Sequence, residues 1–246
     1  MMNLRSYLNK IKPNFQKGGR FEKLHSTFDA FESFLYVPNK VTSKGAHIRD
    51  AVDLKRTMSV VIIALMPALL FGMWNVGYQY YLSIGQHVSL WANFWFGFQK
   101  VIPIVAVSYI SGLAVEFIFA QYRKHEVNEG FLVTGMLIPL LMPVTIPLWI
   151  VAVMTAICVL FVKEAFGGTG MNVFNPALMT RAFIFFAYPA KISGDLVWTW
   201  TNSDKAVDTI TGATPLANAA SDNISKIPSL YDLFFGFIPG SIGETS

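Results

Sequence analysis

Long uncharged apolar runs constrain this chain more than any other feature of its sequence. The run from Met58 to Trp74 holds no charged residue, and the run from Val101 to Ala120 holds only Glu116. About 20 apolar residues are enough to cross the hydrocarbon core of a bilayer as a helix. Over the whole chain 53% of residues are hydrophobic and 14% are charged, whereas about a quarter of a soluble domain is charged. The sequence therefore predicts an integral membrane protein.

Three later apolar segments are short and interrupted. They run from Phe131 to Met142, from Leu148 to Val162 and from Ala177 to Tyr188, and prolines and glycines separate them. Irregular backbone at membrane depth survives only where it is buried in protein or lines a cavity, and such interrupted pairs are typical of internal binding sites. The predicted fold class is all-α: a polytopic membrane protein with broken half-helices. The polar, Gly-containing end at Ser246 leads us to expect a truncated chain.

The distribution of basic residues predicts the orientation. Eleven of the 19 Lys and Arg precede Thr57, and an excess of positive charge marks the cytoplasmic side. Basic residues placed in this way indicate membrane orientation, not nucleic-acid binding. The expected parts are a cytoplasmic arm with amphipathic segments, the transmembrane helices and half-helices, an extracytoplasmic segment and the start of a further membrane segment, at residues 1–56, 57–190, 191–229 and 230–246. The single cysteine, Cys158, predicts no disulfide and no multi-cysteine metal centre.

A polar stretch, residues 208–217, carries the string DTITGATPLA between two apolar regions. Gly212 and Ala213 leave the backbone beside the Thr214 hydroxyl unobstructed, and Asp208 lies six residues before it. From these residues alone, an ordinary Thr/Gly loop is the simpler interpretation.

Several motifs in a fixed order indicate more than a loop. They are HIRDAVDLKR at 47–56, HEVNEGF at 125–131, GGTGMNVFNPA at 167–177, FAYPA at 186–190, TGAT at 211–214 and IPGSIGE at 238–244. Together they resemble the B-type membrane subunit of sodium-translocating NADH:quinone reductases and, less closely, the RnfD subunit of the related Rnf complexes. The resemblance runs from about residue 40 to the end. That family continues through a second half-set of membrane helices, so the expected truncation falls before it.

The resemblance implies two flavins. FMN would be esterified to Thr214 through its phosphate, and Asp208 matches the acid of the flavinylation motif. A non-covalent riboflavin would bind the loop that contains Gly168, Gly170, Asn172 and Asn175. The open alternative is that the two Asn side chains cap the helix that follows. The chain has no Walker or Rossmann pattern, so a nicotinamide site on it is not supported.

Glu116 is the candidate for quinone or sodium chemistry. A carboxylate exposed to lipid costs roughly 2.5–3.5 kcal/mol on insertion scales, so we expect it to face the protein interior or a wet cavity. Gly112, one turn before it, would leave room for a flat ligand, and three aromatic residues could line the pocket: Phe131, Phe183 and Phe185. The alternatives place Glu116 at the cytoplasmic interface and the aromatic rings in lipid or core. Four further charges are expected at the interface: Glu126, Glu129, Lys163 and Glu164.

The resemblance also implies the function. It predicts a redox subunit in the bacterial inner membrane that passes electrons from a partner subunit through FMN and riboflavin to quinone, with outward transport of sodium ions. Its partners would be the other subunits, quinone, sodium and membrane lipid. Three alternatives stay open: an Rnf-type ferredoxin:NAD subunit, a solute transporter or channel with similar broken helices, and an inert fragment. A plain transporter needs no flavin acceptor, so covalent flavin separates it from the redox interpretations.

Overall fold

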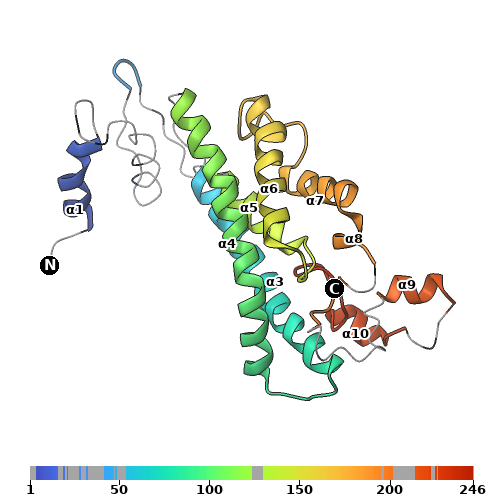
Figure 1. Ribbon diagram of the computed structural model, residues 1–246. Helices are drawn as coiled ribbons and strands as arrows, with labels where there is room; N and C mark the ends of the chain where they lie inside the picture. The colour runs from blue at the N-terminus through green and yellow to red at the C-terminus, as the bar shows by residue number, and fades with distance from the viewer. Residues whose placement is uncertain are drawn as a thin grey trace.

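The computed structural model is a helical bundle with two long antiparallel members (Figure 1). It describes residues 4–15, 19, 21, 28, 32, 42–46, 48, 54–123, 130–194, 197–201, 214–222, 225 and 227–245. These residues form helices and turns with no β-strand, so the predicted all-α class is confirmed. In the described ranges three helices are long and apolar enough to cross a membrane: Arg56–Ser83, Leu90–Arg123 and Leu148–Phe166.

The two long helices, α3 (Leu54–Ser83) and α4 (Leu90–Arg123), form a closely packed hairpin. Small residues let helix backbones approach in a membrane, and two glycines have that role here. A Cβ on Gly97 would overlap the Met73 carbonyl, and a Cβ on Gly77 would overlap the Asn93 carbonyl. Prolines inside both helices, Pro67 and Pro103, do not end them. This hairpin is the wall against which the shorter helices pack.

Helix α5 (Phe131–Leu140) is a half-helix. Its ten residues rise about 15 Å, half of a hydrocarbon core about 30 Å thick. Hydroxyl groups of α4 hold it along its length: Ser108 Oγ donates to the Gly135 carbonyl at 3.0 Å, and Tyr109 Oη donates to the Leu132 carbonyl at 2.6 Å. The chain then turns through residues 141–147 into α6 (Leu148–Cys158). The predicted broken helix is therefore present.

The backbone exposed by this break has its own bonding partners. The Leu140 carbonyl accepts the Gly243 N–H at 2.8 Å, and the Met142 carbonyl accepts the Ile242 N–H at 3.1 Å. Between them, the Leu141 carbonyl accepts Arg181 Nη1 at 2.6 Å. An unsatisfied polar group costs several kcal/mol in hydrocarbon. Residues far along the chain thus stabilise an irregular segment that neither neighbouring helix could satisfy.

Helix α6 continues through an irregular end. Five residues form the π-helix η3 (Val159–Lys163), and three form the 3-10 helix η4 (Glu164–Phe166). A Gly-rich loop, residues 167–175, leads to α7 (Pro176–Ala187) and the short α8 (Pro189–Ile192). The Pro176 carbonyl accepts from Cys158 Sγ at 3.0 Å. Cys158 lies eight residues before Phe166, the last residue of this helical run, so its bond to Pro176 places the start of α7 about 12 Å back along the run. Helix α7 is the second half-helix.

The last described segments lie on the same side of the hairpin as the C-terminal half of α3 (Figure 1). They include the short helices α9 (Pro215–Ala220) and α10 (Leu230–Phe235). Asn75 Nδ2 donates to the Ile238 carbonyl at 3.0 Å, and the Phe237 ring contacts the Trp74 ring. Near the N-terminus, where amphipathic segments are expected within residues 1–56, the chain forms α1 (Leu4–Ile11), followed by the 3-10 helix η1 (Lys12–Phe15). Most of residues 16–53, the rest of the expected arm, lie outside the described residues.

The Gly97 contact predicts a specific packing defect. Gly97→Leu would force the α3 and α4 backbones apart, and overpacking of this kind costs about 1–3 kcal/mol. We expect a lower thermal unfolding midpoint in detergent. Ala106→Leu is the matched control, because Ala106 is exposed on α4. Equal midpoints for the two variants would show that the α3–α4 contact does not depend on the missing side chain.

Candidate functional site

The centre of the candidate site is an ion pair buried within the membrane-spanning helices. Lys163 Nζ, at the end of η3, donates to Glu116 Oε1 on α4. Each side chain is only 3% exposed. A charge in this position is tolerated only when it is paired or hydrated. The pair therefore joins α4 to α6 while it neutralises both residues.

A second pair extends the charges toward the end of α4. Arg123 Nη2 donates to the Glu164 carbonyl at 2.8 Å, and Arg123 Nη1 lies 3.5 Å from Glu164 Oε2. Glu116, Lys163, Glu164 and Arg123, which we name the charged quartet, contain two acids and two bases and are formally neutral. Its outermost member, Arg123, has a side chain 33% exposed. The charged quartet thus extends from the buried pair to the end of α4.

Lys163 and Glu164, which the sequence predicts as interfacial charges, are buried within the protein, at 3% and 4% exposed. Glu126 and Glu129 lie outside the described residues. A signal for the pairing was present in the sequence. No charged residue occurs from 130 to 162, so Lys163 ends the longest uncharged run that follows Glu116. A carboxylate inside a span needs a partner, and this lysine is in position to supply it.

The space beside Gly112 is filled by an aromatic ring of the same chain. A Cβ on Gly112 would collide with the ring of Phe131, which is fully buried. Lys163 Nζ lies 5.6 Å from the centroid of that ring, within the range of cation–π attraction. Three of the predicted quinone or sodium residues, Gly112, Glu116 and Phe131, are therefore neighbours, and Lys163 joins them.

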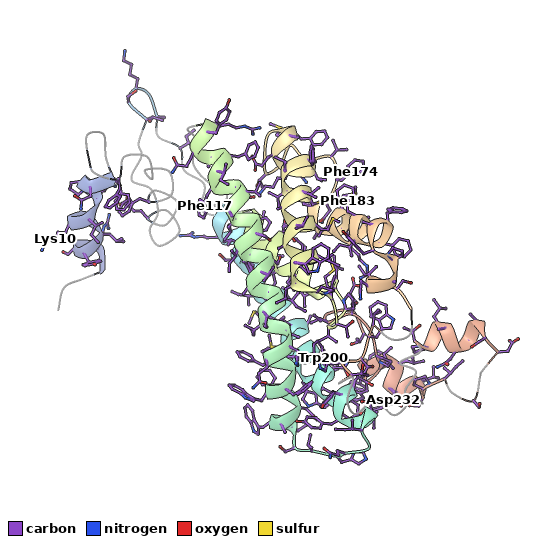
Figure 2. The ribbon with its side chains drawn as sticks, viewed as in Figure 1. Lys10, Phe117, Phe174, Phe183, Trp200 and Asp232 are labelled. Carbon is purple, nitrogen blue, oxygen red and sulfur yellow. The ribbon has the colours of Figure 1, made fainter. Side chains whose placement is uncertain are left out.

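One carboxylate oxygen of this cluster is left over. Glu116 Oε2 is buried and accepts no hydrogen bond from any residue that the structure describes. The remaining predicted residues lie on α7: Phe183 is partly buried, whereas Phe185 is 48% exposed and contacts Phe186 edge to face. Figure 2 labels Phe183 on the α7 side of the molecule. Among the described residues, no hydrogen bond joins either side chain to Glu116, whose Oε1 accepts from Lys163 and whose Oε2 has no donor.

The Gly-rich loop holds itself together with its two Asn side chains. Asn175 Oδ1 accepts the Ala177 N–H at 2.9 Å and the Leu178 N–H at 3.4 Å, which caps α7. Asn172 Oδ1 accepts the Gly170 N–H at 3.3 Å, while its Nδ2 donates to the Phe174 carbonyl at 2.8 Å. Gly168 and Gly170 have φ angles of 98° and 91°, which favour glycine. These contacts agree with the capping alternative for Asn175.

Thr214 lies at the start of α9. Its Oγ1 accepts the Ala217 N–H at 3.2 Å as the N-cap of this helix, and the residue is partly exposed. Asp208 lies outside the described residues. Upstream, Lys100 Nζ on α4 lies 3.9 Å from the centroid of the Trp200 ring, which Figure 2 labels beside the lower part of that helix. This contact anchors Trp200 to α4.

Comparison with known proteins gives a consistent result. A profile of the NQR2, RnfD, RnfE family matches residues 41–246. Similar curated proteins are named as the B-type subunit of a Na(+)-translocating NADH-quinone reductase. Those of Ectopseudomonas mendocina and Stutzerimonas stutzeri are 45% and 46% identical, and all of this chain aligns with 66% of each. The protein of Chromohalobacter salexigens is 44% identical, and the chain aligns with 64% of it. The chain thus spans about two thirds of the length of these relatives.

The Asn175 cap predicts a graded loss of stability. Asn175→Ala removes the acceptor from two helix N–H groups, and loss of such a cap typically costs about 1 kcal/mol. Asn175→Ser keeps an acceptor at the same position and is the control. We expect the thermal unfolding midpoint to fall for the alanine variant and to stay near the parent value for serine. The same fall in both variants would contradict capping as the role of this side chain.

Proposed function

Because the chain belongs to the NQR2, RnfD, RnfE family, we propose that it acts as a redox subunit of a sodium-translocating NADH:quinone reductase. Family membership and three apolar helices make it a membrane protein. The observation that carries the redox proposal is Thr214, a partly exposed hydroxyl at the start of α9 in a TGAT string. The similar proteins that are named as subunits of that reductase support the choice. The other subunits of the complex, quinone and sodium are its proposed partners.

Thr214 is the proposed attachment point of FMN. Its Oγ1 would form the ester bond to the flavin phosphate, and Asp208 would help the modifying enzyme to select this residue. The geometry fits such a group: Thr214 is partly exposed, and within the described part of the chain its hydroxyl has one hydrogen bond, the accepted Ala217 N–H. FMN would supply a centre that accepts and releases electrons. The protein supplies a covalent tether, so the cofactor stays in place between turnovers.

The loop with Gly168, Gly170, Asn172 and Asn175 is the proposed riboflavin site. Its support is the family resemblance together with a Gly-rich loop that is largely exposed, although Gly168 is buried. The side-chain oxygens of both Asn residues already accept bonds, that of Asn172 from the Gly170 N–H of the loop and that of Asn175 from the Ala177 N–H of α7. The riboflavin would therefore contact backbone N–H groups and the remaining donors of the loop. Riboflavin content should then survive Asn175→Ser, which keeps the loop shape.

Glu116 is the proposed residue for quinone or sodium. It is buried beside Gly112 and Phe131, and it carries an oxygen without a donor among the described residues. Phe131 fills the space beside Gly112, so a flat quinone ring would pack on the far side of that ring or displace it. Phe183 and Phe185 on α7 would then border a lateral approach to this pocket from the surface of the helical bundle. The basic residues at the start of α3 and at the end of α4 support a position of the Glu116 site toward the cytoplasmic side of the inner membrane.

Two other functions fit parts of the same structure. An Rnf-type ferredoxin:NAD complex would use the same flavin acceptor, because the family includes RnfD. A solute transporter would use the two half-helices but not Thr214. Covalent flavin separates the transporter from both redox proposals, and reduction of quinone by NADH in the assembled complex separates the reductase from the Rnf type.

Covalent flavin is tested at Thr214. Thr214→Val should abolish in-gel flavin fluorescence of the denatured subunit and leave its amount in the membrane unchanged, because the lost N-cap bond to the Ala217 N–H costs only about 1 kcal/mol. Thr214→Ser keeps the hydroxyl and the cap and is the matched control. Fluorescence retained by the valine variant would rule out Thr214 as the attachment point.

Glu116 is tested by removing its charge without changing its shape, in complexes whose assembly is verified because the change leaves Lys163 without its partner. In the assembled complex, Glu116→Gln should raise the quinone or sodium concentration required for half-maximal rate several-fold. Reduction of the flavins by NADH should stay normal. Glu244→Gln is the control, because that carboxylate is 53% exposed and a solvated ion pair contributes little. Unchanged quinone and sodium dependence in the Glu116 variant would contradict the proposed role.

A further inference from the structure

The ammonium group of Lys163 occupies the position at Glu116 that a mobile cation would take. It bonds to Glu116 Oε1, both side chains are 3% exposed, and Glu116 Oε2 has no donor among the described residues. We propose that Lys163 is a tethered counter-ion that exchanges with a free monovalent cation at Glu116. This inference rests on the proposed function, in which sodium is the coupling ion.

The charge balance of the site requires such an exchange to be one for one. The charged quartet is formally neutral, with Glu116 opposite Lys163 and Glu164 opposite Arg123. Removal of one partner of a buried pair leaves an uncompensated charge, which is strongly destabilising. Lys163 can therefore leave Glu116 only when another single positive charge arrives. Glu116 Oε2 gives that ion a second oxygen ligand of the same carboxylate.

The backbone beneath Lys163 allows it to move. Lys163 is the last residue of the π-helix η3, and the 3-10 helix η4 follows at once. Short π segments inside α-helices frequently occur at functional sites. Each residue of an α-helix turns by about 100°, so a return of η3 to α-helical geometry would rotate Lys163 away from α4. The switch is thus a change of helical register over five residues.

The paired ammonium has a second attractive contact, which the exchange would also break. The Phe131 ring lies 5.6 Å from Lys163 Nζ, and an aromatic face attracts a cation most strongly where water is excluded. Phe131 itself is fixed by its fit against Gly112. The rotation would carry the ammonium out of the buried site, because a lysine near a helix end can extend its charge to the membrane interface, and the incoming cation would then leave the site neutral.

The test compares variants of Lys163 in the assembled complex. Lys163→Met removes the tethered charge, Lys163→Arg keeps it, and Glu116→Gln with Lys163→Met removes both charges. Lys191→Met is the control, because Lys191 is exposed on α8. Two quantities are measured in sodium chloride against choline chloride at constant ionic strength: the sodium concentration for half-maximal quinone reduction, and the thermal unfolding midpoint.

Exchange predicts that Lys163→Met lowers the half-maximal sodium concentration roughly tenfold, a typical coupling between two sites. Its unfolding midpoint should fall in choline and recover in sodium, since a ligand that binds only the folded state stabilises it. Lys163→Arg should raise the half-maximal sodium concentration, because a bidentate guanidinium holds a carboxylate more firmly. The double variant should have a midpoint that does not depend on sodium.

Other results overturn the proposal. If sodium does not restore the unfolding midpoint of Lys163→Met, while the double variant keeps a midpoint near that of the parent, the ion pair has only a structural role. If the complex with Lys163→Met does not assemble, Lys163→Arg decides. A half-maximal sodium concentration equal to that of the parent would then show that the ion pair has only a structural role. A parent complex that keeps covalent flavin but shows no sodium dependence would instead contradict the proposed function, and the two failures are therefore distinguishable.

Discussion

The ion pair between Glu116 and Lys163 is the contact on which the arrangement of this membrane domain depends. It joins the later part of α4 to the end of α6, with both charges buried. Since neither residue tolerates lipid alone, the pair fixes the rotation of α4 and the depth of α6 together. Phe131, Gly112 and η3 then assume positions set by that contact. The candidate site is a consequence of neutralising two charges in a low-dielectric environment.

The same constraint governs the break between α5 and α6. Three consecutive carbonyls, from Leu140 to Met142, would lack partners at membrane depth, and each receives a donor from a distant segment. The donors come from Arg181 and from the turn around Ile242, which is itself 2% exposed. Ser241 and Arg181 in turn both contact Glu244. The last described residues are therefore part of the packing around the break between α5 and α6.

The sequence predicts the helices and their breaks because hydropathy and proline are local signals. It also places Gly112, Glu116 and Phe131 correctly as neighbours, since Glu116 follows Gly112 by one turn and both face inward. It does not predict that Lys163 and Glu164 are buried. Their place at the end of an apolar run is typical of an interface, and the partner that draws Lys163 inward is 47 residues away in sequence. Asn175 shows a similar limit: cap and cofactor ligand have one sequence pattern, and only the observed bonds to Ala177 and Leu178 identify a cap.

The central claim is that this chain carries a flavin on Thr214, and mass spectrometry of the protein isolated from its native membrane tests it most directly. After proteolysis, the peptide that contains Thr214 should have the mass of its sequence plus FMN less one water, with fragmentation placing the addition on that residue. An unmodified Thr214 peptide from a complex that reduces quinone would contradict the claim.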